Sequence, residues 1–94
     1  MIRSYRDEET EKVATGQRSR KLPNDIQQTG RRKLRQLGTV TQLDELRVPN
    51  GNRLEELKGN RKGTYSLRIN DQWRITFDWV DGGPENVCIE DYHR

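Results

Sequence analysis

The spacing of apolar residues is helical in the first part of the chain. Residues 2–6 alternate as a short strand would, and the acidic run after them suits a helix that stops at Gly16, because carboxylates stabilise a helix N-terminus and glycine is typical of its end. Pro23 suits the start of a second helix. From Asn24, apolar or small residues recur at helical spacing up to Gly38: Ile26, Gly30, Leu34 and Leu37. These segments predict one strand and two helices.

A third, shorter helix is predicted at residues 41–46. Thr41 is its expected N-cap, and Asp44 occupies the capping-box position where Glu or Gln is usual. Residues 48–52 contain a proline and an Asn-Gly pair, which predict a turn.

After this turn the apolar period becomes two, which indicates strands. The sequences "TYSLRIN" at 64–70 and "WRITFDWV" at 73–80 each place their apolar residues on one face. The two apolar faces coincide if Ile69 lies opposite Trp73, Leu67 opposite Ile75 and Tyr65 opposite Phe77. This register predicts a hairpin with a three-residue loop, 70–72, of the kind that needs one left-handed residue.

The same register places Arg68 opposite Arg74 on the other face of the hairpin. Like charges facing each other across strands are destabilising. Either the two side chains extend into water, or an anion lies between them, since guanidinium groups bind carboxylates and phosphates in strong paired contacts.

A last strand is predicted at residues 86–92, after a turn at 81–85. If Trp79 pairs with Val87, and Phe77 with Ile89, Tyr92 falls opposite Arg74. Asp91 and His93 then lie at the edge of the two-arginine patch.

Composition limits the size of the core and suggests a partner. The 94 residues are 29% hydrophobic and 35% charged, with a mean hydropathy of −1.21, so one domain with a small core is expected. The net charge is +3. Most of the excess positive charge lies between Gln17 and Arg35, where Asp25 is the single acid; we call the basic residues of this stretch the basic band. Its members are Arg18, Arg20, Lys21, Arg31, Arg32, Lys33 and Arg35. Such a band favours a polyanion as partner, although basic helix faces also occur on other soluble domains.

Other classes of site find little support in the sequence. The single cysteine, Cys88, excludes an internal disulfide framework, and no spacing of Cys or His predicts a metal site. No apolar run is long enough for a signal peptide or a membrane span, so we expect a cytoplasmic protein without a membrane partner, metal or cofactor.

The residues expected near Arg74 suit the cleavage of RNA without a metal. That reaction needs a group that takes the 2′-hydroxyl proton, cations for the charge that grows on the phosphate, and a proton for the departing 5′-oxygen. Lys58, Arg68 and Arg74 offer cations. His93, beside Asp91, offers a group that titrates near neutrality, unless it is merely an exposed terminal histidine, and Tyr92 offers a stacking face or a hydrogen bond.

At these residues the chain resembles a known family. The stretch "NRLEELKGNRKGTYSLRINDQWRITFDW", the later "NVCIEDYH" and the opening "MIRSY" are similar to the HigB branch of the RelE/ParE toxin superfamily, the plasmid-maintenance killer proteins. The most specific pieces are residues 57–61, the 73–75 strand and the terminal Asp91-Tyr92-His93. The similarity covers essentially the whole chain, as a single toxin domain at 1–94.

The resemblance implies a toxin of a type II toxin–antitoxin system: a ribosome-dependent endoribonuclease that cuts messenger RNA in the A site of the 70S ribosome. A helix-turn-helix antitoxin of the HigA type would neutralise it, and their complex would bind operator DNA through the antitoxin. The family's active-site residues match Lys58, Arg74, Asp91, Tyr92 and His93. Glu55 stands where some relatives carry a catalytic histidine. RNA or ribosome contacts are expected from the basic band and from two arginines outside it. The residues named for that role are Arg18, Arg20, Lys21, Arg31, Arg32, Arg35, Arg61 and Arg68.

Pattern and resemblance together predict an α+β fold: a small, mostly antiparallel sheet of four or five strands with the N-terminal helices packed on one face. Two alternatives share this fold. One is a ParE-like inhibitor of DNA gyrase, and the other is a catalytically inactive module that binds RNA or antitoxin.

Overall fold

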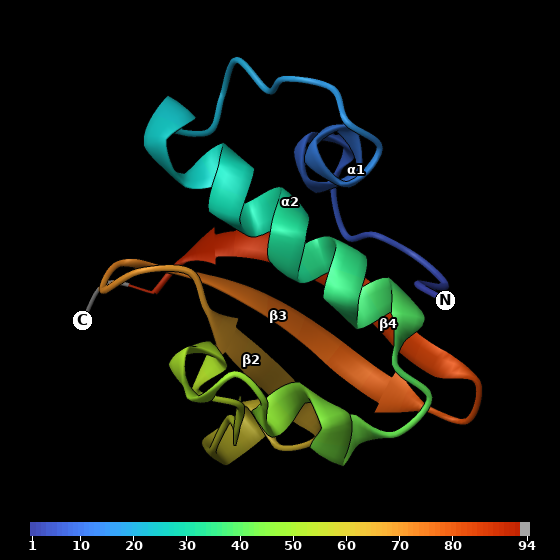
Figure 1. The fold of residues 1–94 in the computed structure, drawn as a ribbon. Coiled ribbons are helices and arrows are strands. Elements are labelled where there is room, and N and C mark those ends of the chain that lie inside the picture. The colour runs from blue at the N-terminus through green and yellow to red at the C-terminus, as the bar shows by residue number, and fades with distance from the viewer. Residues whose placement is uncertain (93–94) are drawn as a thin grey trace.

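Two helices cover one face of a four-stranded antiparallel sheet in the computed structural model, which describes residues 1–92 (Figure 1). The strands follow in the order β1-β2-β3-β4, and α2 lies across the sheet with α1 beside it. This arrangement confirms the predicted α+β class. The elements are α1 (Glu8–Ala14), α2 (Asn24–Thr39), β1 (Glu55–Glu56), β2 (Thr64–Arg68), β3 (Trp73–Val80) and β4 (Gly83–Asp91), with 3-10 turns η1 (Leu43–Arg47), η2 (Asn50–Asn52) and η3 (Gly59–Arg61).

Both predicted helices are present: α2 follows Pro23, as expected, and a side-chain contact marks the start of α1. The side chain of Asp7 caps α1 by accepting a hydrogen bond from the backbone N of Thr10 at 2.8 Å. The third predicted helix is a 3-10 turn whose capping box starts one residue later than predicted. Its N-cap is Gln42, and Glu45 rather than Asp44 accepts from the backbone at the N-cap, because the longer side chain reaches back to it.

The predicted strand at residues 2–6 is reduced to a single parallel bridge between Tyr5 and Val87. The backbone N of Arg6 donates to the carbonyl of Val87 at 2.9 Å, and the N of Val87 donates to Ser4 at 3.1 Å. The N-terminal segment therefore lies along the edge of β4, but the prediction of a strand there was wrong.

The register of the β2–β3 hairpin is as predicted: Tyr65 pairs with Phe77, Leu67 with Ile75 and Arg68 with Arg74. The expectation of a left-handed residue in the loop was wrong, because none of residues 70–72 has a positive φ. Instead the Asn70 side chain accepts hydrogen bonds from the backbone N of Gln72 and of Trp73, both at 2.8 Å, and so closes the turn.

The register of β4 differs from the prediction by two residues. Ile89 pairs with Ile75, and Glu90, not Tyr92, lies opposite Arg74. The strand begins at Gly83 because the turn is only Asp81-Gly82, where glycine permits the positive φ of 97° at Gly82. An irregularity opposite the Thr76–Asp78 stretch absorbs the remaining offset. Since the shift is even, each side chain keeps its predicted face.

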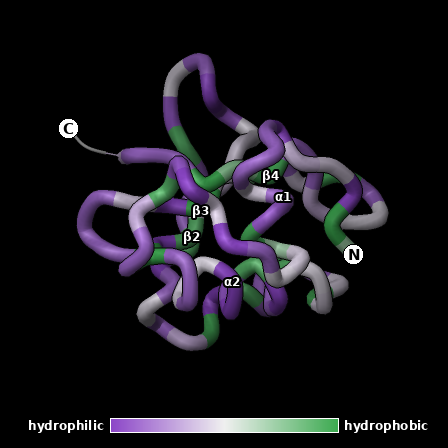
Figure 2. Tube along the Cα trace, turned by 90° about the horizontal axis from the view of Figure 1, so that it is seen from above, coloured by the Kyte–Doolittle hydropathy of each residue, from purple (hydrophilic) through white to green (hydrophobic). Residues whose placement is uncertain are grey.

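The core lies between α2 and the inner face of the sheet. Leu34 and Leu37 of α2 are buried with Leu67, Ile75 and Phe77 of the strands. Hydrophilic segments run through the outer loops, whereas hydrophobic ones concentrate in the interior (Figure 2). Within residues 1–92, no helix combines the length and the apolar character needed to cross a bilayer.

Candidate functional site

Arg74 lies at the centre of a polar cluster on the face of the sheet that α2 does not cover. Its guanidinium donates to Ser66 Oγ at 2.7 Å, forms an ion pair with Glu55 at 3.2 Å, and lies 5.1 Å from the centre of the Tyr92 ring. Its side chain is only 13% exposed. A guanidinium held by three neighbours is pre-oriented for an anion that replaces one of them.

The two opposed arginines each have their own carboxylate. Arg68 forms an ion pair with Asp71 in the adjacent loop, while Arg74 pairs with Glu55 of β1. Each arginine is therefore neutralised by its own nearby carboxylate. This differs from both explanations considered from the sequence, in which the two side chains extend into water or share one anion.

A hollow of about 430 Å³ opens beside this cluster. It is lined by Glu55, Glu56, Leu57, Lys58, Arg61 and Tyr92. Lys58 is exposed and forms no salt bridge with another of the described residues. The hollow thus joins an available cation, a carboxylate and an aromatic ring next to Arg74.

The sequence-predicted site residues do not all come together. Lys58 and Tyr92 line the hollow, and Arg74 lies next to it in contact with Tyr92, diagonally rather than from the opposite position. Asp91 pairs with Trp73 in the sheet, so it belongs to the other face, where Gln72 Nε2 donates to its carboxylate at 2.9 Å. His93 lies outside the described residues.

Two members of the site were not assigned to it from sequence: Glu55 as a partner of Arg74, and Glu90. The carboxylate of Glu90 accepts both terminal nitrogens of Arg61, at 3.0 and 2.9 Å, and also contacts Arg6 and Thr76. The hydrogen bonds from Arg61 hold the pKa of Glu90 below its ordinary value. A signal for Glu90 was present in the sequence, because it stands two residues before Tyr92 and so shares its face.

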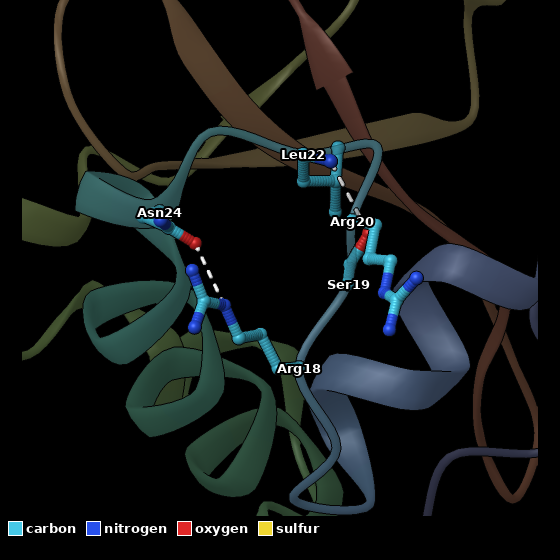
Figure 3. A pocket seen from close by; sticks show the side chains of 5 residues that line it. All are labelled: Arg18, Ser19, Arg20, Leu22 and Asn24. Carbon is cyan, nitrogen blue, oxygen red and sulfur yellow. Dashed lines mark hydrogen bonds between the residues drawn. The ribbon is translucent and has the colours of Figure 1, made fainter.

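The basic band divides into exposed and engaged members. Arg32 and Arg35 are exposed on α2, and Arg18 and Arg20 line a separate hollow of about 600 Å³ before α2 (Figure 3). In Figure 3, Arg18 extends toward Asn24, to which its Nε donates a hydrogen bond at 3.1 Å. The guanidinium of Arg20 points away from both of these residues. Arg31 is half-buried.

Lys33 is not a surface member of the basic band, contrary to the prediction. It is buried at 9% exposure, and its Nζ donates to Asn52 Oδ1 at 2.9 Å. Burial, with Arg32 and Arg68 nearby, lowers the pKa of this amine. The residue lies seven positions after Ile26, on the buried face of α2, so its amine joins α2 to the η2 turn instead of facing solvent.

Comparison with known proteins places the chain in a family. Residues 3–93 match the model of the RelE-like toxins of type II toxin–antitoxin systems, the HigB-like toxins. This chain belongs to the HigB-like toxin family. A HigB-like toxin of a type II system has an antitoxin as its partner.

Individual relatives agree with this placement. The chain is 42% identical over 73 residues to Toxin HigB-1 of Vibrio cholerae serotype O1, a match that covers 78% of this chain and 77% of that protein. It is 37% identical over 65 residues to Endoribonuclease HigB of Proteus vulgaris, covering 65% of each chain. A crystal structure of a YafQ mutant from E. coli superposes with a TM-score of 0.59 at 16% identity, over 98% of this chain and 92% of that one, and so supports the fold.

Proposed function

We propose that this HigB-like toxin is a ribosome-dependent endoribonuclease that cleaves messenger RNA in the A site of the 70S ribosome. The observation that carries the proposal is that Lys58, Tyr92 and Glu55 line one hollow, and that Arg74 contacts the last two of them. These side chains supply phosphate-binding cations, a base-stacking surface and a proton acceptor, which metal-independent RNA cleavage requires. The Proteus vulgaris relative, named as an endoribonuclease, supports the same activity.

The proposed reaction transfers the phosphate from the 5′-oxygen to the neighbouring 2′-oxygen. The 2′-hydroxyl loses its proton to the carboxylate of Glu55, its oxygen attacks the phosphorus, and the bond to the 5′-oxygen breaks. The products are a 2′,3′-cyclic phosphate and a 5′-hydroxyl. Arg74 and Lys58 stabilise the charge on the phosphate oxygens, and Tyr92 stacks on a base. His93, which lies outside the described residues, two positions after Asp91 in the sequence, is proposed to protonate the departing 5′-oxygen.

Substrate binding changes the partner of Arg74 in this account. In the structure Glu55 occupies the guanidinium at 3.2 Å. A scissile phosphodiester carries one negative charge, as the carboxylate does, and offers two oxygens for paired contacts with the guanidinium, so in this proposal it replaces the carboxylate and frees Glu55 to accept the proton. The half-exposed position of Glu55, at 48%, leaves room for that movement.

The ribosome is the proposed source of the substrate, and the basic band is its proposed binding surface, helped by 16S ribosomal RNA that positions the messenger. Within the band, the assigned ribosome contacts are Arg18, Arg20, Lys21, Arg31, Arg32 and Arg35. Outside it, they are Arg68 on β2 and Arg61 next to the hollow. Phosphate contacts of this kind release counterions, so binding weakens steeply as salt rises. Because the target is the translating ribosome, we propose a cytoplasmic location.

A HigA-type helix-turn-helix antitoxin is the proposed partner, and the toxin–antitoxin complex is proposed to bind operator DNA through the antitoxin. The partner binds the folded toxin, so it raises the melting temperature by mass action. A cognate antitoxin that neither raised the melting temperature nor restored translation in an extract would contradict this part of the proposal.

The experiment that tests the proposed activity adds purified toxin, released from its antitoxin, to a translating extract and maps the ends of a reporter messenger. We expect cuts within translated codons and none in the same messenger without ribosomes. A parallel DNA-supercoiling assay with gyrase examines the ParE-like alternative. Intact messenger with inhibited gyrase would establish that alternative, and intact messenger with active gyrase would indicate a binding module.

A further inference from the structure

We infer that Glu90 is a positioning residue of the cleavage site: its ion pair with Arg61 holds the segment 58–63, and with it Lys58, against β4 beside Tyr92. The inference rests on the proposed function, since Lys58 and Tyr92 are assigned their roles there. Glu90 itself contacts no reacting atom in this account, and it acts through Arg61.

The geometry of the pair is specific. Nη1 of Arg61 donates to Oε1 of Glu90 at 3.0 Å, and Nη2 donates to Oε2 at 2.9 Å, so the guanidinium and the carboxylate meet along two parallel bonds. Paired contacts of this form fix orientation as well as distance. Arg6 approaches Oε2 to 3.3 Å, and the hydroxyl of Thr76 donates to the same oxygen. With its side chain 22% exposed, Glu90 is therefore held in one orientation before Arg61 docks.

The segment 58–63 needs an external tie because it has little structure of its own. It contains the single 3-10 turn η3, which begins at Gly59 with a φ of 70° and is followed by Gly63 with a φ of 96°. Both glycines add backbone freedom in the absence of fixed contacts. Hydrogen bonds hold its two ends, from Leu57 N to the Thr64 carbonyl at 2.8 Å and from Gly63 N to Glu56 at 2.9 Å. Among the described residues, the Arg61–Glu90 pair is the side-chain contact that fixes its middle to β4.

The pair also connects two walls of the site. Lys58 and Arg61 line the hollow from the 58–63 segment, and Tyr92 lines it from the end of β4. Glu90 stands two residues before Tyr92 and directly opposite Arg74 in the sheet. One carboxylate thus sets the spacing between the lysine, the tyrosine and the central arginine. Its charge is balanced by Arg61 and Arg6, so it does not repel an incoming phosphate strongly.

A purely structural ion pair would behave differently from a positioning pair. Loss of a structural pair lowers the melting temperature but leaves the cleavage rate of the folded protein unchanged. Loss of a positioning pair lowers the rate in the bound complex, because a displacement of about 1 Å in a catalytic group can cost about 10²-fold. Ribosome affinity should not change in either case, since Glu90→Gln leaves every arginine assigned to ribosome binding in place.

The test compares Glu90→Gln with the matched control Glu85→Gln, which removes a carboxylate from the same strand where it pairs with Arg3 at 3.6 Å. For each purified variant we would measure single-turnover cleavage at saturating 70S ribosomes, ribosome affinity, and hydrogen exchange of the amides at 58–63. We expect Glu90→Gln to cut about 10- to 10²-fold more slowly with unchanged affinity, and to exchange faster at 58–63 but not in β2 or β3. Glu85→Gln should match the parent in all three.

A charge-reversed double variant, Arg61→Glu with Glu90→Arg, supplies a second line of evidence. Restoring the pair in reverse should return protection at 58–63 and part of the cleavage rate. If Glu90→Gln keeps parental cleavage and parental exchange at 58–63, the inference is overturned, including when its melting temperature falls. Should the parent cut no messenger on ribosomes, the proposed function fails, and the exchange measurement alone decides whether Glu90 holds the segment.

Discussion

At the scale of single residues, the site depends on how one buried guanidinium is surrounded. Arg74 would be costly to bury at 13% exposure without partners, and Glu55, Ser66 and the Tyr92 ring supply them. The contact with Tyr92 is with the face of the ring, which both orients the arginine and offers the other side of the ring to a base.

This arrangement predicts that the ring of Tyr92 matters more than its hydroxyl. Tyr92→Phe keeps the ring and should keep most of the cleavage rate. Tyr92→Ala loses the cation–π contact and also the stacking surface, and since stacking on one base is worth about 1–3 kcal/mol, cleavage should fall by at least about 5- to 10²-fold. Single-turnover rates on programmed ribosomes measure both variants. Equal losses in the two would mean that the hydroxyl, not the ring, does the work.

The burial of Cys88 gives a prediction that can be tested without an activity assay. Burial raises the pKa of its thiol to about 11, and the residue is only 6% exposed. Since the thiolate is the reactive form, the folded toxin should react with iodoacetamide far more slowly than the same chain in denaturant. Mass spectrometry of the alkylated protein measures the two rates, and fast labelling of the folded form would contradict the buried position of β4.

At the scale of elements, β4 decides the geometry of the site. The β2–β3 register was predictable because a short loop and clean alternation leave one pairing that matches the apolar faces. The β4 register was not, because Phe77 and Ile75 are both apolar and on the same face, so Ile89 suits either. The choice is made by the tight Asp81-Gly82 turn and the irregularity near Asn86, which has a φ of 54°. Apolar alternation alone carries no signal for these features.

Lys33 on α2 shows that the charge of a residue does not reliably indicate its exposure. The period of α2 was correctly inferred from its apolar residues, yet Lys33 was counted as exposed on the basis of its charge. Its position on the buried side follows from the period itself, and its polar contact with Asn52 could not be foreseen because η2 lies 19 residues away in sequence. Lys58, Arg74 and Tyr92 were named from the sequence and lie close together, whereas Asp91 lies on the other face and Glu90 required the register.

The anchoring of β4 to η3 and the N-terminus predicts how stability depends on pH. The pKa of Glu90 is lowered in the fold, so the ionised carboxylate stabilises the folded state at pH values above its ordinary pKa of 4.5. That contribution is lost as the pH falls from there through the lower folded pKa. Denaturant unfolding between pH 6 and the acid range should show a steeper loss of stability for the parent than for Glu90→Gln. Parallel curves would contradict the role of this pair.

At the scale of the whole molecule, the basic band, which is most of the proposed ribosome-binding surface, is separate from the cleavage site. The exposed arginines of the basic band lie on the helical layer, while Arg74 and Lys58 belong to the sheet and its loops. Binding and catalysis should therefore be separable by mutation. This separation follows from the fold, because α2 covers only the inner face of the sheet.

Reversing two exposed charges on α2 should weaken ribosome binding without affecting the fold. Arg32→Glu with Arg35→Glu avoids Arg31, which is half-buried and donates to the Gly16 carbonyl at 3.3 Å. Each lost phosphate contact should lower the slope of log affinity against log salt by about 0.9 or less. Sedimentation with ribosomes at several salt concentrations measures the slope, with Arg47→Glu on η1 as control. Unchanged binding would remove these arginines from the interface.

The central claim is that Arg74 and its neighbours form a catalytic site for messenger cleavage on the ribosome. The most direct measurement is single-turnover cleavage of a defined messenger in the A site of 70S complexes by the parent and by Arg74→Ala, with ribosome binding measured alongside. The account predicts that both proteins bind equally, that the parent cuts at the bound codon, and that Arg74→Ala cuts about 10²- to 10³-fold more slowly, because a main stabiliser of the phosphate charge is gone. Equal cleavage rates for the two proteins, or an intact messenger with the bound parent, would contradict it.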